Sequence, residues 1–391
     1  MVTIIGNGMG AYNFNNIDIN FCSYDKILCD VNFQDSGNNV LKLKFKEIKE
    51  YILENYEKEN ILYVVTGSPL FFSAGTLIAS KLPRDKVEMI NNTSSKDYMM
   101  KRFFIGESSI DSISLHGRKH IDLSKFLTNT YTFILCDKDS CDKVSEAVKY
   151  LSKDDLEVTI GYKLGYEDEV IEQIDMKSFN YRAFDLSQPY VLLIQKLFKP
   201  SNGIKKDSDF DTQRGMITKK YKRQLSLQNL DLEPNQLLWD IGAGSGSCGI
   251  EAYNRYKSRV IFFEKNEDRT LNIKKNLSNH RVVDCELLIG EAQEKFEDLE
   301  ENPQRIFVGG GGSEVIKKLP YLYERLDENG IMLINVITLK HLSLMNTILN
   351  ESNIEYEVHS LSLTTYKGKL DLVEPERQLF QIKIMKQKEE I

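Results

Sequence analysis

The sequence has few of the features that mark metal-binding, disulfide-rich or membrane-spanning proteins. Its six cysteines form no C-x-x-C pair and its five histidines form no H-E-x-x-H motif. We therefore expect no metal site and no disulfide framework, and we predict that the cysteines are packed thiols. The longest apolar runs, such as residues 61–65 and 191–194, are strand-sized. They are far shorter than the roughly 20 residues of a membrane span, so no membrane partner is expected.

Positive charge is also in short supply. The formal net charge is −7, with acidic and basic residues interleaved, which does not favour the phosphate attraction on which nucleic-acid binders depend. The start of the sequence, residues 1–6, has no basic region and runs directly into a strand pattern. A secretory signal is not expected, and the sequence predicts a cytoplasmic protein.

The length predicts more than one domain. A chain of 391 residues exceeds what one hydrophobic core usually organises. The polar segment 199–209 contains both Pro and Gly and separates two stretches that each alternate strand and helix patterns. We place a domain boundary there and predict domains at 1–203 and 204–391.

Upstream of this boundary the pattern predicts an α/β domain. Val144, Ala147, Val148 and Leu151 have the spacing of an amphipathic helix with one buried stripe. Alternating strands and helices argue for parallel sheets covered by helices. The predicted strands are 2–5, 61–66, 87–90, 112–115, 131–136, 156–160 and 191–195.

Downstream the alternation is cleaner. Five strand-like runs are followed by a helix-length stretch at 339–350 and by two further strands with no clear helix between them. This order matches the seven-stranded sheet of Rossmann-like methyltransferases. The predicted strands are 237–241, 260–264, 286–289, 305–308, 331–336, 355–363 and 379–385.

The most informative motif is a glycine turn after the first of these strands. Asp240 precedes Gly242, Gly244 and Gly246, and Glu264 ends the next strand twenty residues after Gly244. Glycines let the backbone approach a nucleotide cofactor, and a carboxylate at this distance is placed to accept hydrogen bonds from ribose hydroxyls. The G-x-G-x-G form with a preceding Asp resembles S-adenosylmethionine-dependent methyltransferases. We therefore predict that these five residues bind S-adenosyl-L-methionine.

The loops after the third and fourth strands carry further candidates. Ligands of open α/β sheets lie beyond the carboxyl ends of the strands, so Gly290, Glu291 and Ala292 are predicted to flank the adenine, although Glu is also favourable in any first helical turn. The fourth loop contains four consecutive glycines. A cofactor site at Gly309 and Gly310 with acceptor contacts at Gly311 and Gly312 explains them, and a flexible connector is the alternative. The loop lacks the Asn/Asp-Pro-Pro-aromatic sequence of amine-directed nucleic-acid methyltransferases.

A basic stretch at 214–223 precedes the predicted cofactor domain. It is either a solvated helix, which is the usual reason for a charge run, or a segment that folds over the site and presents cations to an anionic acceptor. The second interpretation makes Thr218, Lys219 and Arg223 substrate-binding candidates.

These residues together resemble a specific family. Residues 215–219, the sequence LWDIGAGSGSCGIE from Leu238 and the glycine-rich fourth loop are similar to the decarboxylating precorrin-6B C15-methyltransferases of cobalamin biosynthesis. Residues 66–72 resemble the G-D-P-L-F-F loop of tetrapyrrole methylases, and residues 114–118 match the S-x-H-G-R segment of precorrin C5-methyltransferases. A natural fusion of these two enzymes in this order is known, so the resemblance spans nearly the whole chain.

The resemblance implies a bifunctional enzyme. The C-terminal domain, a class I methyltransferase, methylates C15 and removes the carboxyl of the C12 acetate, and the N-terminal tetrapyrrole-methylase domain methylates C5. The substrate is a carboxylate-rich tetrapyrrole, with or without cobalt. No catalytic nucleophile or metal in the protein is expected, and a homo-oligomer is expected by analogy.

In the N-terminal domain the resemblance assigns cofactor contacts to two loops and substrate contacts to a third. Met9 stands where the family has Pro, and Ser68 replaces the family's acid. Two alternatives stay open beside the bifunctional enzyme: an N-terminal module that only holds substrate, and a methyltransferase for another small molecule. The expected cofactor contacts are Gly6, Gly8, Gly10, Gly67 and Ser68, and the expected substrate contacts are His116 and Arg118.

Overall fold

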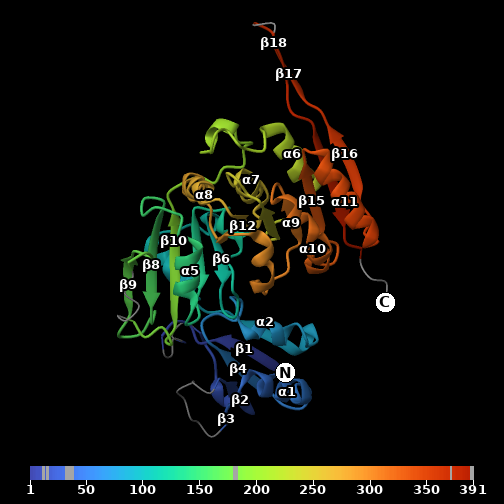
Figure 1. The fold of residues 1–391 in the computed structure, drawn as a ribbon. Helices are drawn as coiled ribbons and strands as arrows, with labels where there is room; N and C mark the ends of the chain where they lie inside the picture. Colours follow the sequence, from blue (N-terminus) through green and yellow to red (C-terminus); the bar gives the residue numbers. More distant parts are fainter. Residues whose placement is uncertain (11–13, 15–16, 31–38, 179–183, 370–371, 388–391) are drawn as a thin grey trace. The chain divides into compact units, whose positions relative to one another are not determined.

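The computed structural model describes residues 1–391 except 11–13, 15–16, 31–38, 179–183, 370–371 and 388–391. The described chain groups into two compact units (Figure 1). Unit 1 comprises Met1–Lys119, Asn129–Asp142 and Glu157–Leu197, and unit 2 comprises His120–Thr128, Lys143–Leu156 and Phe198–Ile391. No helix in the described ranges is long and apolar enough to cross a membrane.

Unit 1 contains a parallel five-stranded sheet of order β3-β2-β4-β1-β5. Its two central strands are buried along their whole length, as expected where both faces of a parallel sheet are covered. Ile48 and Ile52 of one helix are buried in the same core as Val2 and Ile4. The elements are β1 (Val2–Gly6), β2 (Lys26–Cys29), β3 (Val40–Lys42), α1 (Phe45–Asn55), β4 (Ile61–Val65), α2 (Ala74–Ala79), β5 (Val87–Ile90) and α3 (Ser95–Phe103).

A second five-stranded sheet follows, in the order β6-β7-β10-β8-β9. The prediction of parallel pairing is right for β6 with β7 but wrong for β7 with β10, which are antiparallel. β9 was not predicted, and it pairs with β8 in the antiparallel sense. No helix separates β8 from β9, so a tight return replaces the crossover that parallel strands need. The elements are β6 (Ile110–Ser114), α4 (Leu123–Phe126), β7 (Tyr131–Leu135), α5 (Ser140–Ala147), β8 (Leu156–Tyr162), β9 (Val170–Ile174) and β10 (Tyr190–Lys196).

Unit 2 is built on the predicted seven-stranded sheet, of order β13-β12-β11-β14-β15-β19-β16. β11 to β15 pair in parallel, and β19 is antiparallel to both of its neighbours. Trp239, Phe263 and Phe296 pack together in the core. The elements are α6 (Lys220–Asn229), β11 (Leu237–Ile241), α7 (Ser247–Tyr256), β12 (Arg259–Glu264), α8 (Glu267–Asn279), β13 (Cys285–Ile289), β14 (Arg305–Val308), α9 (Gly312–Lys317), α10 (Leu319–Arg325), β15 (Ile331–Val336), α11 (Leu339–Glu351), β16 (Glu357–Leu361) and β19 (Leu379–Met385).

The hairpin of β17 (Thr364–Lys367) and β18 (Leu372–Pro375) was not predicted from the sequence. It extends away from the seven-stranded sheet (Figure 1), and its side chains Leu372 and Val373 are both exposed. Without a buried face, it has no alternation of apolar and polar residues to reveal it. Another expectation fails at Cys22, which is exposed rather than packed.

Candidate active site

A cavity of about 790 Å³ opens at the carboxyl ends of the parallel strands of unit 2. Residues following β11, β12, β13 and β14 line one end of it, as expected for a ligand site in an open α/β sheet. Its volume lies within the range of small-molecule sites. The predicted residues in its wall are Thr218, Lys219, Gly242, Gly244, Glu264, Gly290, Glu291, Ala292, Gly309, Gly310 and Gly311.

The glycine turn and Glu264 are joined directly. The N–H of Gly244 donates to Glu264 Oε2 at 2.8 Å, and the N–H of Asn266 donates to Oε1 at 2.9 Å. Gly244 has φ +62°, and a Cβ there would meet only Gly242 O, at 3.9 Å. The turn thus presents bare backbone to the cavity, which is what a close-lying ligand requires. Glu264 is almost fully buried but keeps lone pairs for hydroxyl donors.

A further polar group in this cradle is unpartnered. Ser245 lines the cavity, and its buried Oγ has no hydrogen-bond partner among the described residues. Buried polar atoms normally have partners. The cradle therefore fits a ligand that carries hydroxyl or amino groups, as the adenosyl part of S-adenosylmethionine does.

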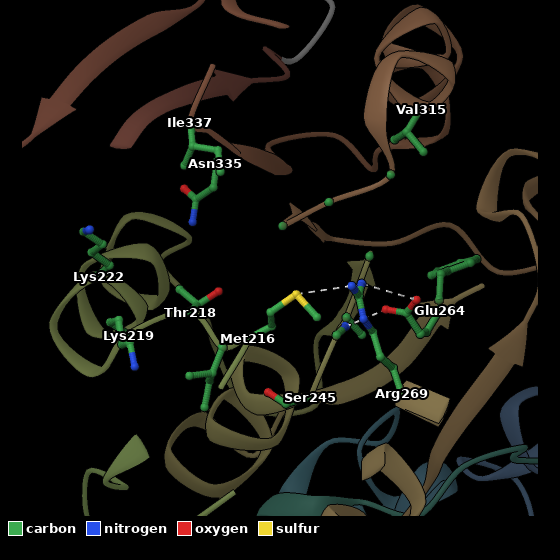
Figure 2. Close-up of a pocket in the computed structure, with 18 of the residues that line it drawn as sticks. Met216, Thr218, Lys219, Lys222, Ser245, Glu264, Arg269, Val315, Asn335 and Ile337 are labelled. Carbon is green, nitrogen blue, oxygen red and sulfur yellow. Dashed lines mark hydrogen bonds and ion pairs between the residues drawn. The ribbon is translucent and has the colours of Figure 1, made fainter. Parts of the chain in front are cut away.

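Arg269 lies over Glu264 at the cavity's edge. Its Nη1 is 3.9 Å from Glu264 Oε1, and its Nη2 is 3.5 Å from the sulfur of Met216. Figure 2 shows these three side chains linked in a row. The segment that carries Met216 is therefore held against the end of the cavity that Glu264 lines.

Asp240 does not line the cavity. Its Oδ2 accepts a hydrogen bond from the N–H of Gly249 at 2.9 Å, and its Oδ1 is buried with no partner among the residues described. Burial raises the pKa of Asp240 to about 7; the Gly249 hydrogen bond opposes this rise and the charge of Glu264 adds to it. Asp240 therefore ties β11 to the start of α7 and supports the turn from behind. Gly246, also outside the cavity wall, directly precedes α7 and has φ +74°.

The four-glycine loop packs against the first glycine turn. A Cβ on Gly242 would lie 2.6 Å from Gly310 Cα, so the two backbones are in close contact. This packing accounts for part of the glycine content, and it differs from both explanations that the sequence suggested, a ligand site and a flexible connector. Gly309, Gly310 and Gly311 line the cavity, whereas Gly312 begins α9 outside its wall.

The basic stretch divides between the cavity and the core. Residues 215–219 and Lys222 line the cavity, which agrees with the interpretation of a segment folded over the site. Arg223 is fully buried instead: Nε pairs with Glu251 at 2.5 Å and Nη1 with Asp207 at 3.0 Å. These ion pairs occupy its guanidinium, so its assignment to substrate binding is corrected to a structural role.

The far end of the cavity combines Thr218 and Lys219, which were predicted, with residues that the sequence analysis did not assign to a site. Figure 2 shows Asn335 and Ile337 with Thr218, Lys219 and Lys222, across the cavity from Glu264. The connection between β18 and β19 completes this end. Lys222 lies in the basic stretch at 214–223, whereas the sequence gives no local signal for the others, because they come from segments distant in the chain. The unassigned residues of this end are Lys222, Asn335, Ile337, Pro375, Glu376, Arg377 and Leu379.

Unit 1 has a cavity of its own, of about 270 Å³. Of the predicted cofactor residues, Gly8, Gly10, Gly67 and Ser68 line it. The Gly8 N–H donates to Gly67 O at 3.0 Å, which brings the two predicted loops together. Gly6 lies behind the wall, where a Cβ would be 2.1 Å from Gly67 O.

The remaining candidates of unit 1 are placed differently. Ser68 Oγ donates to Asn91 Oδ1 at 2.6 Å and accepts from the Leu70 N–H at 3.1 Å, so it holds its own loop. His116 and Arg118 are exposed in the turn after β6 and are not among the residues lining the cavity.

The comparisons with known proteins match each part of the chain. The model of the precorrin methyltransferase domain matches residues 209–386, and that of the tetrapyrrole (corrin/porphyrin) methylases matches residues 22–179. The chain is 33% identical over 156 residues to a probable cobalt-precorrin-6B C(15)-methyltransferase (decarboxylating) of Pyrobaculum calidifontis, covering 39% of this chain and 79% of that protein. The chain belongs to the precorrin methyltransferase family.

Another precorrin methyltransferase matches across both parts. The precorrin-6Y C(5,15)-methyltransferase [decarboxylating] of a Sinorhizobium species is 26% identical over 290 residues, which are 71% of this chain and 68% of that protein. A crystal structure of a precorrin-6y C5,15-methyltransferase from Geobacter metallireducens, at 30% identity, covers 46% of this chain and 96% of that one with a TM-score of 0.44. The precorrin methyltransferase model covers every residue that lines the cavity of unit 2. The tetrapyrrole methylase model covers those lining the cavity of unit 1 except residues 8–10 and 189–191.

Proposed function

We propose that this precorrin methyltransferase is a bifunctional S-adenosyl-L-methionine-dependent enzyme of corrin biosynthesis. The C-terminal part methylates precorrin-6B, or its cobalt form, at C15 and decarboxylates the C12 acetate. The N-terminal part methylates the resulting precorrin-7, or its cobalt form, at C5. The observation that carries the proposal is that both family models lie on one chain and that each covers residues lining a separate cavity.

The domain division supports two separate reactions. We propose domains at 1–203 and 204–391, although contacts place the short stretches His120–Thr128 and Lys143–Leu156 in unit 2. In unit 2 the cofactor contacts are proposed at Glu264, the glycine turn and residues 290–292. In unit 1 they are proposed at the loops containing Gly8 and Gly67.

The protein's part in methyl transfer is to position two reactants. When bound, S-adenosylmethionine supplies an electrophilic methyl group on a sulfonium. Glu264 and the backbone at Gly244 hold its adenosyl part, and the loop 309–311 presents bare backbone beside the acceptor. Holding reactants in line contributes roughly 7 to 11 kcal/mol in favourable cases. Met216 and the segment 215–219 cover the cavity and limit the entry of water.

Decarboxylation fits the same cavity. The bond between the acetate methylene and its carboxyl breaks, its electron pair moves into the conjugated macrocycle, carbon dioxide leaves, and a proton is then taken up. The protein needs only to bind the macrocycle in a fixed orientation. Apolar side chains at the far end, Ile337, Pro375 and Leu379, offer a surface for its face.

The test is a turnover assay on the full-length protein. It is incubated with precorrin-6B or cobalt-precorrin-6B and methyl-labelled S-adenosylmethionine, and the products are measured by mass spectrometry. We expect two methyl additions and one loss of carbon dioxide. One methyl addition would leave the N-terminal part as a substrate-holding module, and none would indicate a different small-molecule acceptor.

Two variants assign each methyl group to its unit. Glu264→Ala weakens the cofactor site of unit 2 and is expected to stop C15 methylation, and with it the C5 methylation that acts on the product. Ser95→Trp fills the cavity of unit 1, which Ser95 lines, and is expected to stop C5 methylation. If Ser95→Trp leaves both additions intact, the proposed site in unit 1 is wrong.

We propose a cytoplasmic location and a homo-oligomeric state, both of which rest on the sequence analysis. Light scattering after size-exclusion chromatography measures the oligomeric state. A mass of 45.1 kDa at all concentrations would contradict the second expectation.

A further inference from the structure

Five cationic side chains line the cavity of unit 2, and four of them are already partnered. Lys219 Nζ lies 3.8 Å from Asp207, and Lys222 Nζ lies 3.1 Å from Glu376. Lys265 Nζ is 3.0 Å from Glu291, and Arg269 is 3.9 Å from Glu264. The charges of these four are therefore at least partly balanced by the protein itself.

Arg377 is the exception. It lies in the connection between β18 and β19, is exposed, and lines the far end of the cavity. Within the described part of the chain no ion pair or side-chain hydrogen bond engages its guanidinium. A guanidinium in this position is available for a carboxylate, which it binds with two parallel hydrogen bonds.

The backbone of Arg377 is nevertheless held in place. Lys222 Nζ donates to Arg377 O at 2.5 Å and pairs with the carboxylate of the preceding residue, Glu376. Both Lys222 and Glu376 have largely buried side chains, 12% and 23% exposed. α6 therefore fixes the connection that carries Arg377, while the guanidinium itself stays free.

We propose that Arg377 binds a peripheral carboxylate of the tetrapyrrole acceptor and thereby determines specificity for carboxylate-bearing macrocycles. The proposal rests on the proposed function of unit 2. Apolar side chains at the same end, Ile337, Pro375 and Leu379, pack against the macrocycle, and Arg377 anchors its rim. A carboxylate retained in the product is the partner, because stabilising the carboxylate that leaves would oppose decarboxylation.

Lys222 is a positioning residue in this arrangement. Its pairing with Glu376 keeps that carboxylate away from the neighbouring guanidinium. If Lys222 loses its charge, Glu376 is released to neutralise Arg377 in place of the substrate. The structure therefore predicts that a Lys222 variant resembles an Arg377 variant, and that removing the charge of Glu376 reverses the effect.

The first experiment measures binding and turnover of Arg377→Gln and Arg377→Lys in the full-length protein. Binding of precorrin-6B is measured by calorimetry with S-adenosylhomocysteine present. Arg377→Gln is expected to raise KM and the dissociation constant about tenfold or more, with kcat within about twofold, because a charge-assisted contact is lost. Arg377→Lys keeps the positive charge but cannot make two parallel hydrogen bonds. Its KM and dissociation constant are expected to lie between those of the unaltered protein and of Arg377→Gln. Affinity for S-adenosylhomocysteine should not change.

The matched control is Lys369→Gln, which removes a cation from the turn of the β17–β18 hairpin, outside the cavity wall. It is expected to bind and turn over like the unaltered protein. Equal KM and dissociation constants for Arg377→Gln and this control would overturn the inference.

The second experiment compares Lys222→Met with the double variant Lys222→Met/Glu376→Gln. The single variant is expected to raise KM severalfold and the double variant to recover most of the loss. A merely structural role for Lys222 predicts no recovery, and that result would overturn its positioning role.

Failure of the proposed function is separable from failure of this inference. If the unaltered protein binds precorrin-6B without turning it over, the function is wrong, and weaker binding by Arg377→Gln still supports the carboxylate contact. If the unaltered protein does not bind precorrin-6B at all, both are overturned.

Discussion

At the scale of the single residue, substitution of Glu264 is predicted to change the affinity for the cofactor most. Its two oxygens accept from Gly244 N–H and Asn266 N–H, which orients the remaining lone pairs toward the cavity. Glu264→Gln is expected to weaken S-adenosylmethionine binding about tenfold or more, because hydrogen bonds to a charged group contribute roughly 1.5–3 kcal/mol. Isothermal titration calorimetry measures the dissociation constant of S-adenosylmethionine in each protein.

The control for this variant is Glu328→Gln, at an exposed position outside the cavity wall. It is expected to leave the affinity unchanged. An unaltered affinity in Glu264→Gln, with folding intact by circular dichroism, contradicts the cofactor site proposed for unit 2.

Asp240 makes a prediction about pH. Its pKa in the folded protein, about 7, lies above the ordinary value of 3.8, so the folded state favours the protonated form. The stability that this group contributes is complete below about pH 4 and is lost as pH rises to about 7, at roughly 1.4 kcal/mol for each pKa unit. Asp240→Asn should remove this loss and keep the Gly249 hydrogen bond.

The measurement is the melting temperature between pH 4.5 and pH 8. The unaltered protein should lose more stability over this range than Asp240→Asn does. Asp298→Asn, at an exposed position, should follow the unaltered protein. Parallel curves for the unaltered protein and Asp240→Asn would show that the buried carboxyl is not protonated at neutral pH.

At the scale of the element, the two glycine loops of unit 2 differ in how much room they leave for a side chain. A Cβ on Gly242 would lie 2.6 Å from Gly310 Cα, and Gly242 has φ +71°, whereas a Cβ on Gly310 would have no described neighbour closer than 3.5 Å. Gly242→Ala should destabilise unit 2 by about 1–3 kcal/mol or more. Gly310→Ala should lower the free energy of unfolding by less than about 1 kcal/mol. Chemical denaturation of both variants measures these changes. Equal losses would mean that the loops do not pack as described.

Most of the predicted strands have a buried apolar run, but the match is incomplete, because β2, with three buried residues, was missed and β16, with none, was predicted. β11, β12 and β14 are buried along their whole length, so their composition alone marks them as strands. β3 has no buried residue, and the β17–β18 hairpin has exposed apolar side chains. Neither gives a pattern to find.

The predicted site follows the same logic. Glu264 and the glycine turn were predicted because their spacing is local. Arg223 was misassigned because the residues that bury its charge, Asp207 and Glu251, are separated from it in the chain. From the sequence alone, the basic stretch gives no sign that one of its charges is buried and paired. Arg377 was missed because only the fold brings it to the cavity.

At the scale of the whole molecule, His120 lies in one of the short stretches that precede residue 198 in the chain but belong to unit 2. His120 belongs to unit 2, where it contacts Asp284 at 3.2 Å, Glu301 at 3.3 Å and Arg259 at 2.9 Å. Burial lowers the pKa of His120 and Arg259 lowers it further, but hydrogen bonds to the two carboxylates outweigh both and raise it above 6.5. The pKa of Glu301 falls to about 2, chiefly through the hydrogen bond from His120.

The sign of the resulting pH dependence follows. Because the folded pKa of His120 is raised, its contribution to stability is complete below about pH 6.5 and is lost as pH rises through the folded value. His120→Gln should therefore lower the melting temperature of unit 2 at pH 6 and have little effect at pH 9, by differential scanning calorimetry. An equal effect at both pH values would contradict the ion pairs.

Each unit is assembled from three stretches of the chain. A gene split at a single codon would leave one product without part of its folded unit, since residues 120–128 and 143–156 are encoded upstream of residue 198. The tetrapyrrole methylase model matches residues 22–179 without a break, so these two stretches belong to that family's sequence although their contacts lie in unit 2. A truncated form of this chain that ends near residue 203 would therefore leave them without those contacts.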